Sequence, residues 1–181
     1  MKYLMFLALA VIATAAAGQG CPPVPDHSDA LSQLLAEVQA APNDRAGQEV
    51  SNRMWELWTD APDEPAQELL DTGMRARGSY DYLRAIEAFD RLIAYCPDYA
   101  EGYNQRAFVN FLRQDYAAAL PDLDRALELS PRHVAALAGK GLTLMGLGRD
   151  AEAQEALRAA VALNPWLSER HLLQENQGQE L

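Results

Sequence analysis

Three prolines divide most of the chain at one fixed spacing. Pro97, Pro131 and Pro165 are each 34 residues apart. Three further positions of the repeat keep the size of their residue in every copy: small at two positions and bulky at the third. They are Ala85, Ala119 and Ala153; Phe89, Leu123 and Leu157; and Gly73, Ala107 and Gly141. Four columns in register predict a tandem repeat whose units fold alike and stack on one another.

Within each unit, the apolar residues are spaced as they are on two successive helices. In the first unit Leu69, Gly73 and Ala76 step by four and three residues, which places them on one helix face. A second helical stripe, with Ala85 and Phe89, follows a turn. Small residues where two helices cross let them approach closely, and a proline ends the second helix. The pattern predicts an all-α solenoid of antiparallel helix pairs.

The unit resembles the tetratricopeptide repeat (TPR), a 34-residue helix–turn–helix motif. The matching units are 66–99, 100–133 and 134–167. Aligned on Pro62, residues 27–65 form a degenerate helical hairpin, which we interpret as a divergent fourth repeat. Each repeat buries its face only against its neighbours, so the array needs a cap. We expect residues 168–181 to supply a short capping helix and a polar tail.

The first residues are typical of a bacterial export signal. Lys2 precedes an apolar run over residues 4–17, which is too short to cross a membrane as a helix. We expect residues 1–17 to be a signal peptide and residues 18–26 a Pro-rich linker. The protein is then periplasmic or secreted, with no direct membrane span.

The two cysteines matter in such an oxidising compartment. Three interpretations are open: a disulfide between Cys21 and Cys96, two unpaired thiols, or a lipid on Cys21 as in bacterial lipoproteins. Residues 18–20 lack the leucine that a lipoprotein signal carries three positions before its cysteine. Lipid anchoring is therefore the least favoured of the three.

The charge balance excludes some partners. The chain has 26 acidic and 15 basic residues, a net charge of -11, and its cations form no stripe. Nucleic acid and anionic membranes are therefore not expected partners. His27, His133 and His171 belong to no metal-binding or catalytic motif, and His133 is expected to cap a helix or face solvent. The sequence predicts no cofactor, no metal and no enzymatic activity.

The resemblance implies a binding surface, because the first helix of each TPR unit lines a concave groove. Apolar side chains at these positions would anchor a partner, and polar ones would hydrogen-bond its backbone or carboxylate. The alternative for Phe108 and Phe111 is packing within the core. The expected groove residues are Leu70, Met74, Arg77, Asn104, Gln105, Phe108, Phe111, Leu142 and Met145.

These features predict a non-catalytic adaptor or scaffold that holds a protein or peptide partner in the cell envelope. Some TPR proteins hold the acidic tails of cytosolic chaperones through a pattern of Lys and Asn. That pattern is missing here, since Leu70, Met74 and Gln105 stand at three of its positions. The alternative is a structural or assembly component that self-associates weakly through Trp55 and Trp166, which flank the array.

Overall fold

A computed structural model describes residues 20–174, so the expected signal peptide lies outside the described residues. The described part contains eight α-helices, one short 3-10 helix and no β-strand, which confirms the all-α class. The helices are α1 Ser28–Gln39, α2 Asp44–Trp58, α3 Glu64–Gly78, α4 Tyr82–Tyr95, α5 Ala100–Leu112, α6 Tyr116–Leu129, α7 Val134–Gly146 and α8 Asp150–Leu163, followed by the 3-10 helix η1 Ser168–Leu172.

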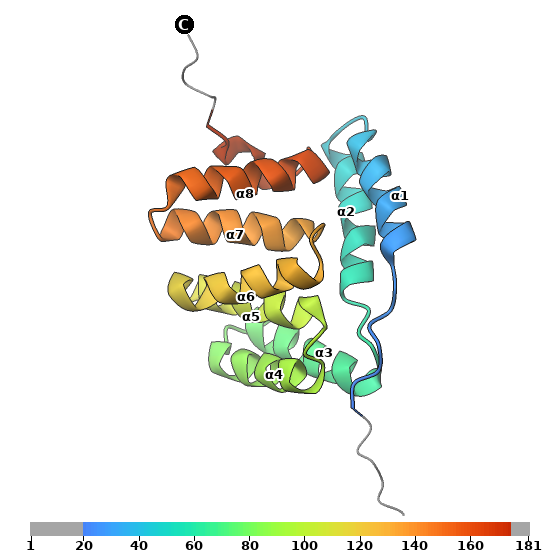
Figure 1. Ribbon diagram of the computed structural model, residues 1–181, viewed down its shortest axis with the longest axis vertical. Coiled ribbons are helices and arrows are strands. Elements are labelled where there is room, and N and C mark those ends of the chain that lie inside the picture. Colours follow the sequence, from blue (N-terminus) through green and yellow to red (C-terminus); the bar gives the residue numbers. More distant parts are fainter. Residues whose placement is uncertain (1–19, 175–181) are drawn as a thin grey trace, which may run out of the picture.

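Helices α3 to α8 form three antiparallel pairs stacked in one direction (Figure 1). The close approach within a pair depends on a small residue facing a large one. A Cβ atom added to Gly73 would lie 2.3 Å from a ring carbon of Phe89, and one added to Gly141 would lie 2.6 Å from Leu157. Both distances are far below van der Waals contact. The small and large columns of the 34-residue period are thus the two sides of one packing arrangement.

The turn inside each pair repeats its backbone conformation. Tyr80, Gln114 and Gly148 have φ of 63°, 61° and 70°, and they are 34 residues apart. In the first two units the next aspartate caps the following helix: the side chains of Asp81 and Asp115 accept hydrogen bonds from backbone N–H groups. The chain therefore reverses in the same way in each unit, although only the third turn has a glycine at the left-handed position.

The N-terminal hairpin, α1 with α2, does not continue the solenoid. It lies across the ends of α3–α8 instead of stacking on α3 (Figure 1), so its interpretation as a fourth repeat is wrong. The two positions that are small in true repeats hold Val38 and Val50, which are buried inside the hairpin. Their bulk prevents the close crossing that a repeat pair needs.

Helix α2 instead follows the loops that join one repeat to the next. The Tyr99 hydroxyl donates to the Trp58 carbonyl at 2.8 Å, and the Trp58 ring stacks on His133. Further along, the Asn164 amide donates to the Ser51 hydroxyl at 2.9 Å. The hairpin thus contacts all three boundary loops of the array.

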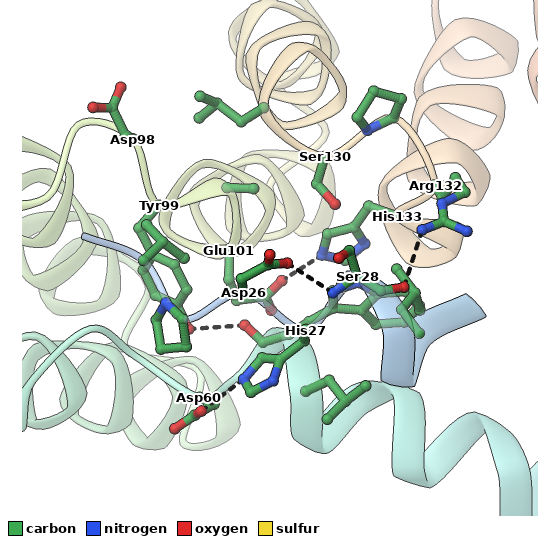
Figure 2. Close-up of a pocket in the computed structure, with 18 residues that line it drawn as sticks. Asp26, His27, Ser28, Asp60, Asp98, Tyr99, Glu101, Ser130, Arg132 and His133 are labelled. Carbon is green, nitrogen blue, oxygen red and sulfur yellow. Dashed lines mark hydrogen bonds and ion pairs between the residues drawn. The ribbon is translucent and has the colours of Figure 1, made fainter. Parts of the chain in front are cut away.

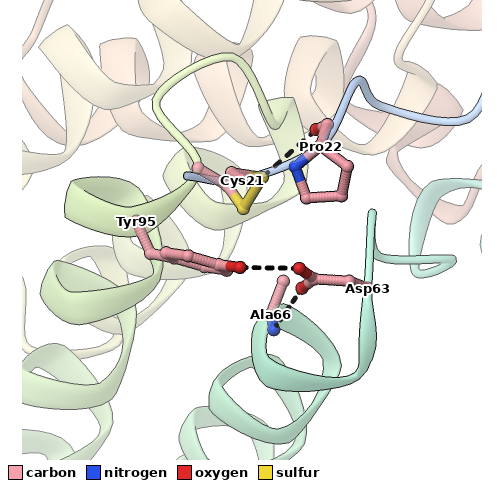
Figure 3. The surroundings of a disulfide bond; sticks show 6 residues. Cys21, Pro22, Asp63, Ala66 and Tyr95 are labelled. Carbon is pink, nitrogen blue, oxygen red and sulfur yellow. Dashed lines mark hydrogen bonds between the residues drawn. A yellow bond between two sulfur atoms is a disulfide. The ribbon is translucent and has the colours of Figure 1, made fainter. Parts of the chain in front are cut away.

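A contact from the linker that precedes the hairpin and a contact at the hairpin's far end hold this part of the chain against the array. A disulfide joins Cys21 to Cys96, with Cα atoms 5.1 Å apart, just beyond α4 (Figure 3). At the other end the indole N–H of Trp166 donates to the Val38 carbonyl at 3.1 Å, and its ring packs on Gly47. The expected capping helix is the short η1, which packs on α8. The first and last repeats are therefore bridged by one element.

Candidate functional site

The largest concentration of titratable side chains lies in a cavity of about 300 Å³ between the hairpin and the boundary loops, here called the seam cavity (Figure 2). Four of these groups form two pairs. His27 lies 2.7 Å from Asp60, and His133 lies 2.8 Å from Glu101. Arg132 donates hydrogen bonds to the Ser32 hydroxyl and the Ser28 carbonyl. The cavity is bordered by contacts that join the hairpin to the repeats.

His133 is the residue of this cavity whose chemistry most resembles a general base, yet both ring nitrogens are used. The Ala136 backbone N–H donates to Nδ1 at 3.3 Å, so Nδ1 is the acceptor and the neutral ring carries its proton on Nε2. That proton is donated to Glu101. The side chain is 1% exposed, so the expected capping role is correct and the solvent-facing alternative is wrong.

A second cavity, of about 180 Å³, lies on the first helices of the repeats, and we call it the groove pocket. Arg77, Phe108 and Phe111 line it, as the expected binding surface requires. Phe108 is 43% exposed, which identifies it as a surface residue rather than a core residue. Phe111 is half-buried and contacts the ring of Tyr116. The groove pocket is thus an apolar hollow with an accessible aromatic wall.

Three expected groove residues are buried. Leu70 of α3 is fully buried in the hydrophobic core. Asn104 and Gln105 line the pocket, but both are buried and their amide groups donate to Glu101 at 3.0 and 2.5 Å. One N–H of each amide is therefore already bonded to an internal carboxylate, so these two side chains have less capacity to bind a peptide backbone than expected.

The other expected groove residues have different positions. Met74 and Leu142 are half-buried, and Met145 is 37% exposed near the end of α7. None of the three lines the groove pocket. They are surface or near-surface residues on the same first helices as the pocket.

Arg77 is the only charged residue among those that line the groove pocket. Its guanidinium lies over the Phe108 ring, 4.7 Å from the centroid, and hydrogen-bonds the Gln105 side-chain oxygen. No ion pair of the described residues includes it, and burial lowers the pKa of Arg77, although the charge of Glu101 opposes this. A partly desolvated cation with no carboxylate in ion-pair contact favours binding of an anion.

Trp55 also lines the groove pocket, and sequence reasoning did not place it there. It comes from α2, so no repeat pattern could bring it to this position. The proposed use of Trp55 and Trp166 for self-association also loses support, because Trp166 packs within the fold. A pocket lined by both the hairpin and the repeats forms only when the hairpin folds back on the array.

The described residues contain neither a membrane-spanning helix nor a metal-binding cluster. None of their helices has the length and apolarity needed to cross a membrane. No group of three or more His, Cys, Asp or Glu side chains among them is placed to hold a metal ion.

The stacked helix pairs and the groove on their first helices define an α-solenoid repeat protein. Residues 111–175 match the tetratricopeptide repeat family model. A TPR repeat-containing protein of Rhizobium etli is 28% identical over 120 residues, 66% of this chain and 59% of the relative. Tetratricopeptide repeat protein 36 of Xenopus tropicalis is 36% identical over 114 residues, 60% and 55% of the two chains.

Among solved structures, the second TPR domain of human RPAP3 in complex with an HSP70 peptide is similar with a TM-score of 0.56 and 28% identity. The match covers 58% of this chain and 88% of that domain. The chain spans just over half the length of the curated relatives it matches. Fold, repeat period and these similarities agree that the chain contains tetratricopeptide repeats.

Proposed function

We propose that this protein is a non-catalytic adaptor that binds a peptide segment of another protein on the concave side of its repeats. The observation that carries the proposal is the groove pocket, where exposed Phe108 lies beside the cation of Arg77, which forms no ion pair with another described residue. Support comes from the human RPAP3 domain, which was solved with a bound peptide. Aromatic and arginine side chains are enriched among residues that dominate binding energies.

The peptide recognised here differs from a chaperone tail held by several polar side chains. Two of the positions that would hold such a tail carry the buried Leu70 and Gln105. We therefore propose that apolar contacts with Phe108 and Phe111 supply most of the affinity. Arg77 adds one charge-assisted hydrogen bond to a carboxylate, for which its guanidinium retains unused N–H donors.

The protein is also proposed to work outside the cytoplasm, in the periplasm or after secretion. The disulfide between Cys21 and Cys96 supports this, because such bonds persist in oxidising compartments. The same bond argues against a lipid on Cys21, since the lipid and the disulfide would need the same sulfur atom.

A random peptide library displayed on phage tests the binding function. Peptides selected on the full chain should bind Phe108→Asp at least about tenfold more weakly, because a carboxylate would lie in the apolar wall. Leu83→Asp is the matched control: Leu83 is 75% exposed on α4, outside the groove pocket. Peptides that bind both variants as tightly as the wild type would refute binding in the groove.

A further inference from the structure

We propose that Trp55 of the N-terminal hairpin is a partner-contacting residue that sets the size of the side chain accepted by the groove pocket. This inference rests on the proposed function. The pocket walls come from two sources: the repeats supply Phe108 and Phe111, and the hairpin supplies Trp55. The recognition site is therefore not a property of the repeats alone.

Trp55 can act as a wall because α2 is fixed on both sides of it. Three residues further along, Trp58 stacks on His133 and accepts a hydrogen bond from Tyr99. Four residues before it, Ser51 accepts a hydrogen bond from Asn164. Both contacts lie within about one helical turn of Trp55, so they restrict the rotation and sliding of α2 at this residue. The indole ring is half-buried, so part of it remains available to a ligand.

The size of the pocket limits what can enter. At about 180 Å³ it lies below the roughly 300–1,000 Å³ of pockets that enclose a drug-sized ligand. One apolar side chain is the occupant that this volume and lining favour. Without Trp55 the pocket would lose one wall and open along α2.

The polar groups of the pocket define the rest of the ligand. Arg77 offers a cation to a carboxylate close to the entering side chain. The Thr143 hydroxyl, which lines the same pocket, is completely buried and has no hydrogen-bond partner. The ligand that these groups favour is a peptide that presents one apolar side chain next to a carboxylate, as an apolar residue at a free C-terminus does.

The test uses four acetylated peptides, Gly-Gly-X with a free C-terminal carboxylate, where X is Ala, Leu, Phe or Trp. Dissociation constants are measured by titration of the full chain followed by NMR. The wild type should bind the Leu or Phe peptide roughly tenfold more tightly than the Ala peptide and discriminate against the Trp peptide. In Trp55→Ala the affinity for the Trp peptide should rise roughly tenfold relative to the affinity for the Leu peptide.

Two controls separate the role of Trp55 from general damage to the hairpin. Glu56→Ala changes the exposed neighbour on α2 and should leave the order of the four peptides unchanged. In the wild type, nuclear Overhauser effects should connect the side chain X to the indole ring of Trp55. This measurement decides the question even if Trp55→Ala does not fold.

The outcomes distinguish this inference from the proposed function. If Phe108→Asp abolishes binding but Trp55→Ala keeps the wild-type order and no contact to the indole is seen, the groove function stands and the role of Trp55 is rejected. If none of the four peptides binds, recognition of an apolar residue next to a carboxylate is rejected, and the role of Trp55 with it. If selected library peptides bind Phe108→Asp unchanged, the groove function itself fails.

Discussion

The indole of Trp58 stacks on the imidazole of His133 with ring centroids 4.3 Å apart and an interplanar angle of 12°. The two residues belong to different parts of the fold: Trp58 ends the N-terminal hairpin, and His133 lies at the boundary between the second and third repeats. Through Glu101, His133 is also linked to the second repeat. This pair is therefore a central contact between hairpin and array.

Trp58→Ala should lower the free energy of unfolding by about 2–3 kcal/mol, less than the roughly 3–5 kcal/mol of a fully buried ring because Trp58 is half-buried. Trp58→Phe keeps a ring and removes a buried indole N–H that has no partner, so its loss should stay below about 1 kcal/mol. Urea unfolding followed by circular dichroism compares the two. Equal losses in both variants would show that stacking does not hold the hairpin.

Reduction of the disulfide should destabilise the protein. The bond joins residues 75 positions apart, and releasing a loop of that length costs about 4 kcal/mol in the chain-entropy model. Unfolding in urea with and without dithiothreitol measures this loss. A variant with Cys21→Ser and Cys96→Ala should match the reduced protein and show no response to dithiothreitol. A reduced protein as stable as the oxidised one would contradict the expected role of the bond.

Two glycines of α3 should respond in opposite directions to the same substitution. Gly73→Ala places a methyl group against Phe89 and should cost about 1–3 kcal/mol. Gly78→Ala meets no atom within 4 Å at the exposed end of the helix, so it should stabilise by up to about 1 kcal/mol. Thermal unfolding of both variants checks the contrast. A tolerated Gly73→Ala would show that α3 and α4 can separate without loss.

Stability should fall at alkaline pH because of Tyr99. Burial, together with the negative charges of Glu101, Asp60 and Asp71, raises the pKa of Tyr99 in the folded state. In the unfolded chain a tyrosine ionises near pH 10. The contribution of neutral Tyr99 to the free energy of unfolding is therefore complete below about pH 10. Above that pH the free energy of unfolding falls by up to about 1.4 kcal/mol per pH unit.

The comparison of wild type with Tyr99→Phe isolates this effect. Phenylalanine carries no titrating group, so the variant should lack this part of the alkaline slope. It also loses the hydrogen bond to the Trp58 carbonyl, which lowers its stability at all pH values. Urea midpoints measured from pH 8 to 11 give both slopes. Parallel curves would refute the assignment to Tyr99.

The repeat array could be predicted from the sequence because its rules are local and periodic. Gly73 and Phe89 belong to one unit, and the spacing of small and large residues on two adjacent helices determines how they pack. The same reasoning placed Phe108 and Arg77 on a shared surface, because each belongs to the first helix of its unit and the two units are adjacent. It could not show that Leu70 is buried, because groove and core positions lie side by side on one helix.

By itself, the sequence determined the 34-residue period, the helix pairs and the candidates for a groove. The tertiary structure decided where the N-terminal hairpin lies, which of those candidates are free, and that Trp55 joins them. The physical reason is distance along the chain. Contacts such as Trp58 with His133 join residues from unrelated parts of the sequence. They form only because the hairpin buries its apolar face across the ends of the repeat helices. Val38 and Val50 make the hairpin too bulky to stack as a repeat itself.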